Sequence, residues 1–223
     1  LAEVKKRSEG LSVFLVDLRE CVGKSITVRP IRNMVNHETN EIFIDNLEIP
    51  VENRIGEEGL GLKYIMDGLN AERILIAAEC IGDGRWFIDR VTAYAKERVV
   101  FGRPIGQNQG VAFPIARAHV NVEAADLMRF KACALFDAHE PCGAEANAAK
   151  YLAGEAAYDA CQQAVMTHGG FGYAKEYHVE RYLLDRVRAG RSAMDHDDST
   201  DDGCLQLDGD RVQLLCRTWH APD

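Results

Sequence analysis

The sequence predicts a mainly α fold, in which an antiparallel four-helix bundle is preceded by a partial β-sheet. Two observations predict it: alternating β-branched residues over residues 1–55, and helical periodicity over residues 56–188. The composition agrees, because 47% hydrophobic and 27% charged residues are ordinary for a globular chain. Residues 189–223 follow neither period and are expected to form an atypical, disordered tail.

Three strands are predicted within residues 1–55, at residues 11–18, 24–31 and 41–50. They are rich in β-branched residues and are separated by Asn, Asp and Gly. Three strands alone make a weak domain, so this segment is expected to be part of a larger β domain.

The helical periodicity of residues 56–188 divides into segments at Gly and Pro. The breaks fall at residues 101–106 and 169–172, and Pro141 suits a first helical turn. The helices are predicted at about residues 60–97 (one helix or two nearly continuous ones), 108–139, 141–168 and 176–188. The third contains many alanines, which permit close approach between helices.

Charge and composition exclude several classes of protein. The net charge of −9 argues against a nucleic-acid partner, and residues 189–223, with 8 acidic and 3 basic residues, carry −5 of it. No run of 18 apolar residues predicts a membrane span, and no signal peptide is visible. The seven cysteines form no CxxC pair and the seven histidines no ligand motif, so we expect reduced thiols and no metal site.

Glu72 is the first candidate for chemistry. It shares a predicted helix face with Ile65, Leu69 and Ile76, where loss of solvation would raise the proton affinity of its carboxylate. That property suits a general base working near neutral pH. A buried carboxylate paired with an arginine is the alternative, and the residues alone favour it.

Two further patterns could bind a phosphate-containing ligand. Arg98, Phe101 and Gln109 surround a Gly/Pro turn that could offer a guanidinium, an aromatic ring and an amide. The glycine-rich turn at residues 169–172 could approach a pyrophosphate, but it follows a helix and lacks the GxGxxG spacing of a Rossmann fold. Ordinary helix capping and a helix–helix turn are the alternatives.

Four segments are informative when they are taken together. They are GEEGLG at 56–61, GLNAERI at 68–74, YAKERVVFGRPI at 94–105, and HGGFGY at 168–173 with EYHVER at 176–181. In this order and spacing they resemble the acyl-CoA dehydrogenase family, and the resemblance covers about residues 1–188.

The resemblance implies a fold and an activity. Family members have an N-terminal helical domain, a middle β domain and a C-terminal four-helix domain, and this chain resembles the second half of the middle domain plus the C-terminal domain. The family is usually homotetrameric or homodimeric, binds FAD and oxidises acyl-CoA thioesters to 2-enoyl-CoA. It implies electron-transfer flavoprotein as electron acceptor, and a location in the bacterial cytoplasm or, in a eukaryote, the mitochondrial matrix.

The resemblance also implies roles for individual residues. Asn70 and Arg73 match substrate-side positions, and Glu72 matches the catalytic base of one subgroup. Other members place the base in a Tyr-Glu-Gly-Thr motif, which does not occur here. The positions that match FAD-binding ones are Arg98, Phe101 and Gln109, which in the family contact FAD of a neighbouring subunit, and Met166, His168, Gly169 and Gly170; Met166 stands where many relatives have Gln.

The implied reaction is α,β-dehydrogenation, in which Glu72 removes the α-proton and the β-hydrogen leaves as hydride to flavin N5. Two alternatives stay open. One is a truncated, non-catalytic fragment that acts at most as a helical oligomerisation module, and the other is an enzyme like the acyl-CoA oxidases. After residue 188 the family pattern stops, and we interpret residues 189–223 as the product of a wrong reading frame or gene end. The acyl chain length cannot be predicted from the sequence.

Overall fold

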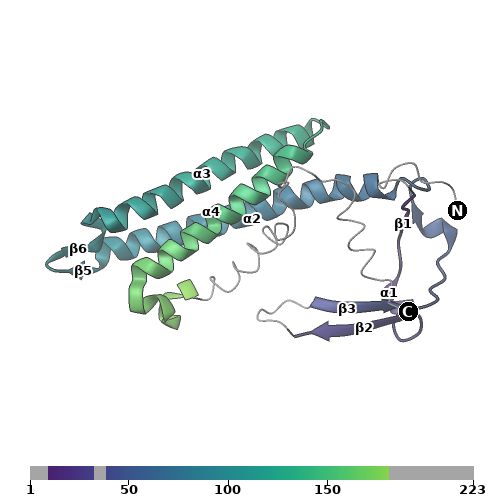
Figure 1. The fold of residues 1–223 in the computed structure, drawn as a ribbon, viewed down its shortest axis with the longest axis horizontal. Coiled ribbons are helices and arrows are strands. Elements are labelled where there is room, and N and C mark those ends of the chain that lie inside the picture. The colour runs from purple at the N-terminus through teal and green to yellow at the C-terminus, as the bar shows by residue number, and fades with distance from the viewer. Residues whose placement is uncertain (1–9, 33–38, 181–223) are drawn as a thin grey trace, which may run out of the picture. The chain divides into compact units, whose positions relative to one another are not determined.

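A computed structural model describes residues 10–32 and 39–180 of the chain (Figure 1). Three long helices dominate it, and the strands are short. The elements in chain order are β1 Val13–Phe14, α1 Leu18–Cys21, β2 Ile26–Ile31, β3 Thr39–Ile44, η1 Val51–Asn53, β4 Arg54–Ile55, α2 Gly61–Glu97, β5 Val99–Val100, β6 Arg103–Pro104, η2 Ile105–Gln107, α3 Gln109–Asp137, α4 Gly143–His168, η3 Gly169–Tyr173 and η4 Lys175–Tyr177. The predicted mainly α fold class is confirmed.

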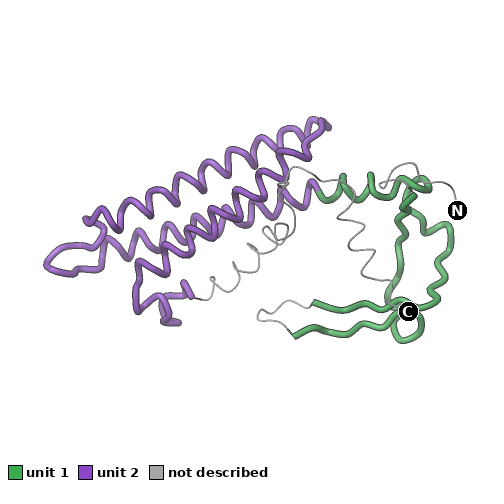
Figure 2. Tube along the Cα trace, in the orientation of Figure 1, with its two compact units in different colours: residues 1–69, 206–223 green, residues 70–205 purple. Residues whose placement is uncertain are grey.

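The chain divides into two compact units, coloured separately in Figure 2. The first includes the strands β1–β4 and runs to residue 69, and the second begins at residue 70, inside α2. The sequence pattern instead changes from strand to helix at residues 55 and 56.

The first unit contains an antiparallel pair formed by β2 and β3. Six residues of each strand pair in register, from Ile26 opposite Ile44 to Ile31 opposite Thr39. A second, shorter antiparallel pair joins β1 and β4. Ile26 is buried, whereas most other apolar side chains of these strands are exposed or half-buried.

The strand predictions agree with this unit only in part. The strand predicted at 24–31 forms as β2, but the one predicted at 11–18 is reduced to β1 because Asp17 caps the short helix α1 with its side chain. The strand predicted at 41–50 forms as β3 and ends at Ile44. Asn46, two residues later, has a positive φ of 46°, which a continuing strand does not permit.

The second unit contains three long helices whose ends lie close to the predicted positions. Helix α2 is a single helix to Glu97, and α3 and α4 follow over residues 109–137 and 143–168. Pro141 lies two residues before α4, not inside its first turn. Asn70 of α2 approaches Gly143 of α4, and Tyr94 stacks on His168, so α2 and α4 run in the same direction.

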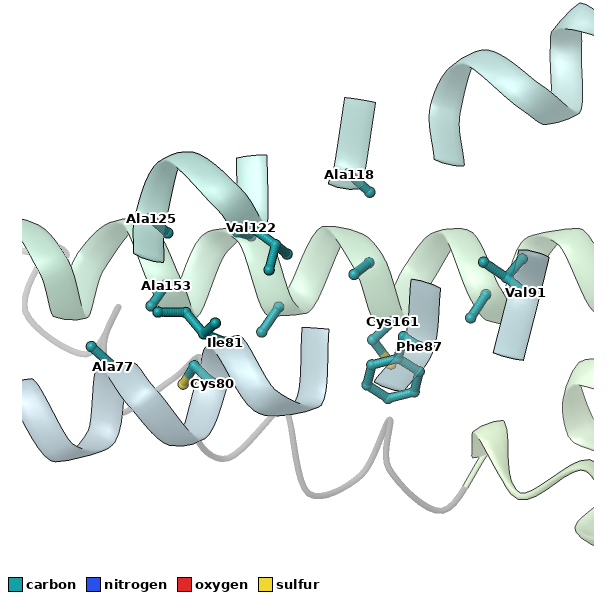
Figure 3. Close-up of a cluster of buried hydrophobic side chains, with 14 of the residues drawn as sticks. Ala77, Cys80, Ile81, Phe87, Val91, Ala118, Val122, Ala125, Ala153 and Cys161 are labelled. Carbon is teal, nitrogen blue, oxygen red and sulfur yellow. The ribbon is translucent and has the colours of Figure 1, made fainter. Parts of the chain in front are cut away.

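Small side chains form much of the contact surface between these helices. Helix α4 presents fully buried alanines at three- and four-residue spacing, and Figure 3 shows the core side chains of α2 and α3 meeting them. Gly84 of α2 lies directly against both α3 and α4, because a Cβ there would be 2.8 Å from Val122 Cγ2 and 3.6 Å from the Cα of Ala157. The buried alanines of α4 are Ala146, Ala149, Ala153, Ala156, Ala157, Ala160 and Ala164.

A buried carboxylate joins α2 to α3. Asp126 accepts hydrogen bonds of 2.7 Å from both Arg85 and Arg129, and Arg85 also contacts Glu123. Burial opposes the ionisation of Asp126, but the hydrogen bonds from the two guanidinium groups outweigh it and lower its pKa. The network therefore neutralises the charged groups that face the helix interface.

The remaining expectations concern the chain ends, the thiols and metals. The fourth helix, predicted at 176–188, lies mostly outside the described residues, as does the whole segment 189–223. Among the residues that are described, no helix is both long and apolar enough to cross a bilayer, and no cluster of three metal-ligand side chains occurs. No disulfide joins the cysteines that are described, namely Cys21, Cys80, Cys133, Cys142 and Cys161.

Two glycines of α2 offer a test of the close packing. Gly84→Ala and Gly82→Ala gain the same helix propensity, about 1 kcal/mol, but a Cβ at Gly82 meets open space. We expect Gly82→Ala to stabilise the protein and Gly84→Ala to be less stable than it by about 1–3 kcal/mol, through overpacking against Val122. Urea denaturation of both variants measures the difference, and equal stabilities would contradict the packing described here.

The Asp126 network predicts a pH-dependent stability. The pKa of Asp126 is lower in the folded than in the unfolded protein. Its contribution to the free energy of unfolding is therefore complete at pH values above the unfolded pKa of about 3.9, and it is lost as the pH falls through the lower folded pKa. At neutral pH, Asp126→Asn should decrease the free energy of unfolding by about 1–3 kcal/mol. Chemical denaturation measures this, and Asp137→Asn, at the exposed end of α3, is the control that should change little.

Candidate functional site

Glu72 lies on α2 near the start of the second unit, and its side chain is exposed. The expectation that it sits on a buried apolar stripe is wrong for the described residues. The face of α2 that enters the core carries Ala77, Cys80, Gly84 and Phe87, and Glu72 points about 100° away from it at 100° per residue. Glu72 is therefore an accessible carboxylate on a rigid helix.

Arg73, the next residue, lies on the core-facing side and is half-buried. Its guanidinium donates a 3.1 Å hydrogen bond to Asn70 Oδ1. Burial lowers the pKa of Arg73, and the negative charge of Glu72 acts in the opposite direction. The three residues that the sequence singled out at 70–73 are thus adjacent, and two of them are directly hydrogen-bonded.

Lys150 of α4 joins these residues and was not identified from the sequence. Burial lowers the pKa of Lys150, and the positive charge of Arg73 adds to this effect while Glu72 counteracts it. The signal was present in the sequence, because Lys150 falls at three- and four-residue spacing from the buried Ala146 and Ala153. We refer to Asn70, Glu72, Arg73 and Lys150 as the Glu72 cluster.

The other predicted residues lie around the far end of α2. After Glu97 the chain forms a hairpin of β5 and β6, with Phe101 at its tip. Phe101 is 100% exposed and has a φ of 53°, a left-handed conformation that a non-glycine residue adopts at a cost. Arg98 and Gln109, at either end of the hairpin, are exposed as well.

The glycine-rich turn after α4 is positioned by aromatic contacts. His168 is buried, its Nδ1 donates to the carbonyl of Ala164 at 2.7 Å, and its ring stacks on Tyr94 with centroids 4.0 Å apart. Tyr177 packs edge-on against both rings. Tyr94 and Tyr177 were not identified from the sequence, since isolated aromatics give no signal until the fold brings them together.

The turn itself leaves its backbone accessible. Gly169 has a φ of 59°, Gly170 is exposed, and a Cβ on either would meet open space. Met166, two residues before the end of α4, is exposed as well. Arg98 lies 5.5 Å from the ring centroid of Phe171, so the end of α2 meets this turn. We refer to Arg98, Phe101, Gln109, Met166, His168, Gly169 and Gly170 as the glycine-turn cluster.

The two clusters lie far apart along the second unit. Arg98 follows Glu72 by 26 residues, which corresponds to about 39 Å at 1.5 Å per residue. The Glu72 cluster offers a carboxylate with two neighbouring cations, and the glycine-turn cluster offers a guanidinium, an exposed ring and open backbone. A carboxylate suits proton transfer, whereas the second set suits an anionic, ring-containing ligand.

Comparison with known proteins identifies the family of this chain. Residues 59–192 match the family model described as acyl-CoA dehydrogenase, C-terminal domain. The chain belongs to the acyl-CoA dehydrogenase family. The match includes all the residues of both clusters and begins close to the start of α2.

Individual relatives support the assignment across more of the chain. An acyl-CoA dehydrogenase of Bacillus subtilis is 38% identical over 177 residues, which are 79% of this chain and 46% of that protein. The caffeyl-CoA reductase–Etf complex subunit CarC of Acetobacterium woodii is 36% identical over 186 residues, or 82% of this chain and 48% of that protein. The solved butyryl-CoA dehydrogenase of Megasphaera elsdenii superposes with a TM-score of 0.75 at 29% identity, over 84% of this chain and 49% of that one.

The chain thus spans about half the length of the relatives that it matches. The matched half contains the C-terminal helical domain of the family, whose match over residues 59–192 includes all the described residues of the second unit. The fold and family membership therefore apply to this chain directly.

Proposed function

We propose that this chain supplies the C-terminal catalytic domain of an FAD-dependent acyl-CoA dehydrogenase, which converts an acyl-CoA thioester to 2-enoyl-CoA. The observation that carries the proposal is the family match over residues 59–192, inside which both clusters fall. The solved structure of butyryl-CoA dehydrogenase, a relative by fold and at 29% identity, supports an acyl-CoA substrate. The name of the Acetobacterium woodii relative supports electron-transfer flavoprotein as the redox partner.

The glycine-turn cluster has the chemistry to hold one end of FAD. The Arg98 guanidinium can pair with a pyrophosphate, and the open backbone at Gly169 and Gly170 lets phosphate or ribose approach closely. Phe101 offers an exposed ring face, and Gln109 an exposed amide. These residues fit the cofactor that the family resemblance implies, and His168, fixed by Tyr94, keeps the turn in place.

The Glu72 cluster has the chemistry to start the reaction. The Glu72 carboxylate takes the α-proton of the thioester, and the electron pair of that C–H bond forms the new C=C bond as the β-hydrogen leaves with its two electrons. FAD, when bound, supplies the acceptor for that hydride, so the substrate loses two electrons and two hydrogens. Asn70 and Arg73, hydrogen-bonded to each other, would orient the polar part of the substrate beside Glu72.

The separation of the clusters supports an oligomer, as a homodimer or homotetramer. A ligand that is held by the glycine-turn cluster lies about 39 Å along α2 from Glu72 of the same chain. Two copies of the chain would let one copy hold the cofactor at which the other copy works. An oxidase-like enzyme is the alternative, and it would consume oxygen with acyl-CoA where a dehydrogenase needs an added acceptor.

Glu72→Gln tests the base directly. In the purified flavoprotein this variant should retain FAD but lose about 10²–10⁴-fold in the rate at which an acyl-CoA substrate bleaches the flavin absorption, because an amide cannot accept the proton. Stopped-flow absorbance measures the rate. Glu97→Gln, exposed at the other end of α2, should bleach normally. Turnover unchanged by Glu72→Gln would remove this residue from the mechanism.

Arg98→Ala tests the glycine-turn cluster. Loss of the guanidinium should decrease FAD retention about tenfold or more, since one charge-assisted contact to a phosphate contributes about 1.5–3 kcal/mol. Arg90→Ala is a matched control, because Arg90 lies 5.2 Å over Trp86 much as Arg98 lies 5.5 Å over Phe171. The flavin-to-protein absorbance ratio after gel filtration measures retention, and equal ratios in the two variants would contradict the role of Arg98.

A further inference from the structure

The guanidinium of Arg98 is held in a different way from several others in the protein. Within residues 10–32 and 39–180, no carboxylate forms an ion pair with Arg98, and its guanidinium carbon instead lies over the ring of Phe171, 5.5 Å from the ring centroid. Ion pairs with carboxylates hold the guanidinium groups of Arg19, Arg54, Arg85 and Arg129.

The backbone of Arg98 is fixed although its side chain is exposed. Arg98 follows directly after α2, and its N–H donates to the carbonyl of Tyr94 at 2.9 Å. Its own carbonyl accepts a hydrogen bond from the N–H of Ile105, also at 2.9 Å. The Arg98 side chain therefore starts from a rigid base, and the position of its charge depends on the surface against which this long side chain packs.

The Phe171 ring is such a surface, and it is itself fixed by its neighbours. The following residue, Gly172, packs tightly against the last turns of α4, because a Cβ there would lie 2.5 Å from the carbonyl oxygen of Val165. The ring of Phe171 packs on Tyr177 with centroids 5.2 Å apart, and Tyr177 packs edge-on against Tyr94 of α2. Phe171 remains 39% exposed, so it is accessible from the solvent side.

A ring and a carboxylate hold a guanidinium with different consequences for an anionic ligand. A carboxylate occupies the N–H donors and neutralises the charge, as it would for a ligand phosphate. An aromatic ring attracts the cation through its quadrupole but carries no net charge, so the donors and the positive charge stay available. Gly169 and Gly170, whose backbone is open, directly precede Phe171. A guanidinium over the Phe171 ring therefore lies beside that open backbone.

We propose that Phe171 is a positioning residue, which holds the Arg98 guanidinium beside the glycine turn without neutralising it, so that both can bind a diphosphate. The inference rests on the proposed function in taking this diphosphate to be that of FAD. Phe171 acts through Arg98 and need not touch the ligand. The competing explanation is that Phe171 only packs the turn against Tyr177, and it predicts different results in the experiments below.

Substitution of the ring tests the contact. Phe171→Leu keeps an apolar side chain but removes the ring, so the dissociation constant of FAD should rise about two- to fivefold, as expected for an exposed cation–π contact. Phe171→Tyr keeps the ring and should bind FAD as the wild type does. Phe130→Leu is the matched control, because the ring of Phe130 lies 4.0 Å from Arg129, which is already paired with Asp126. Titration of the full chain with FAD, followed by flavin fluorescence, measures all three.

A double-mutant cycle separates positioning from packing of the turn. In an Arg98→Ala background, Phe171→Leu should weaken FAD binding no further, because the contact has already been lost. If Phe171 only packed the turn, the loss would be the same in both backgrounds. An equal loss in both backgrounds, or a dissociation constant that Phe171→Leu leaves unchanged, would overturn the positioning role.

Inorganic pyrophosphate distinguishes a failure of this inference from a failure of the proposed function. In NMR spectra of arginine Nε–H groups of the full chain, the Arg98 resonance should be shifted by the ring current of Phe171, and Phe171→Leu should abolish that shift. Pyrophosphate should move the Arg98 resonance at a lower concentration in the wild type than in Phe171→Leu. If these results hold but the wild type binds no FAD, the proposed function fails and the positioning role stands. An Arg98 resonance unaffected by Phe171→Leu, or equal pyrophosphate titrations, would overturn the positioning role whether or not FAD binds.

Discussion

The close approach of α2, α3 and α4 is the constraint on which the second unit depends. Gly84 and the alanines of α4 remove the side-chain volume that would hold the helices apart, so the contact surface is made largely of backbone and Cβ atoms. Packing at this distance fixes the rotation of each helix about its axis, because a small turn would drive a larger side chain into the interface. That rotation decides which residues of α2 and α3 face outward.

This constraint explains why the helices could be predicted while the environment of Glu72 could not. The breaks between α2, α3 and α4 fall near Gly102 and Pro141, and α4 ends at Gly169, so these boundaries have local causes. Near Glu72 the inward face of α2 begins with the small residues Ala77 and Cys80, whereas the larger Ile65 is 41% exposed. The apolar residues closest to Glu72 in the sequence therefore do not mark the face of α2 that enters the core.

The site residues that could be predicted from the sequence are those that are neighbours in the chain, whereas those that were missed are brought together by helix packing. Residues 70–73 are consecutive, so their proximity needed no tertiary information. Lys150 and Tyr94 come to the site only because α2 and α4 run in the same direction, a fact set by long-range packing. The exposure of Glu72 also means that the described helices, α2, α3 and α4, do not themselves exclude water from it. In the proposed reaction, water would have to be excluded by substrate, cofactor or further protein.

The tip of the β5–β6 hairpin combines two features that folding alone would not select. Phe101 adopts a left-handed backbone conformation, which costs a side-chain-bearing residue about 1 kcal/mol or more. Its ring is also fully exposed to solvent. Glycine would remove both penalties, and asparagine would reduce the first and remove the second. An aromatic ring in such a place gains no burial from its own chain. We therefore interpret the Phe101 ring as one side of a contact with another molecule, and the β5–β6 hairpin as the element that positions it.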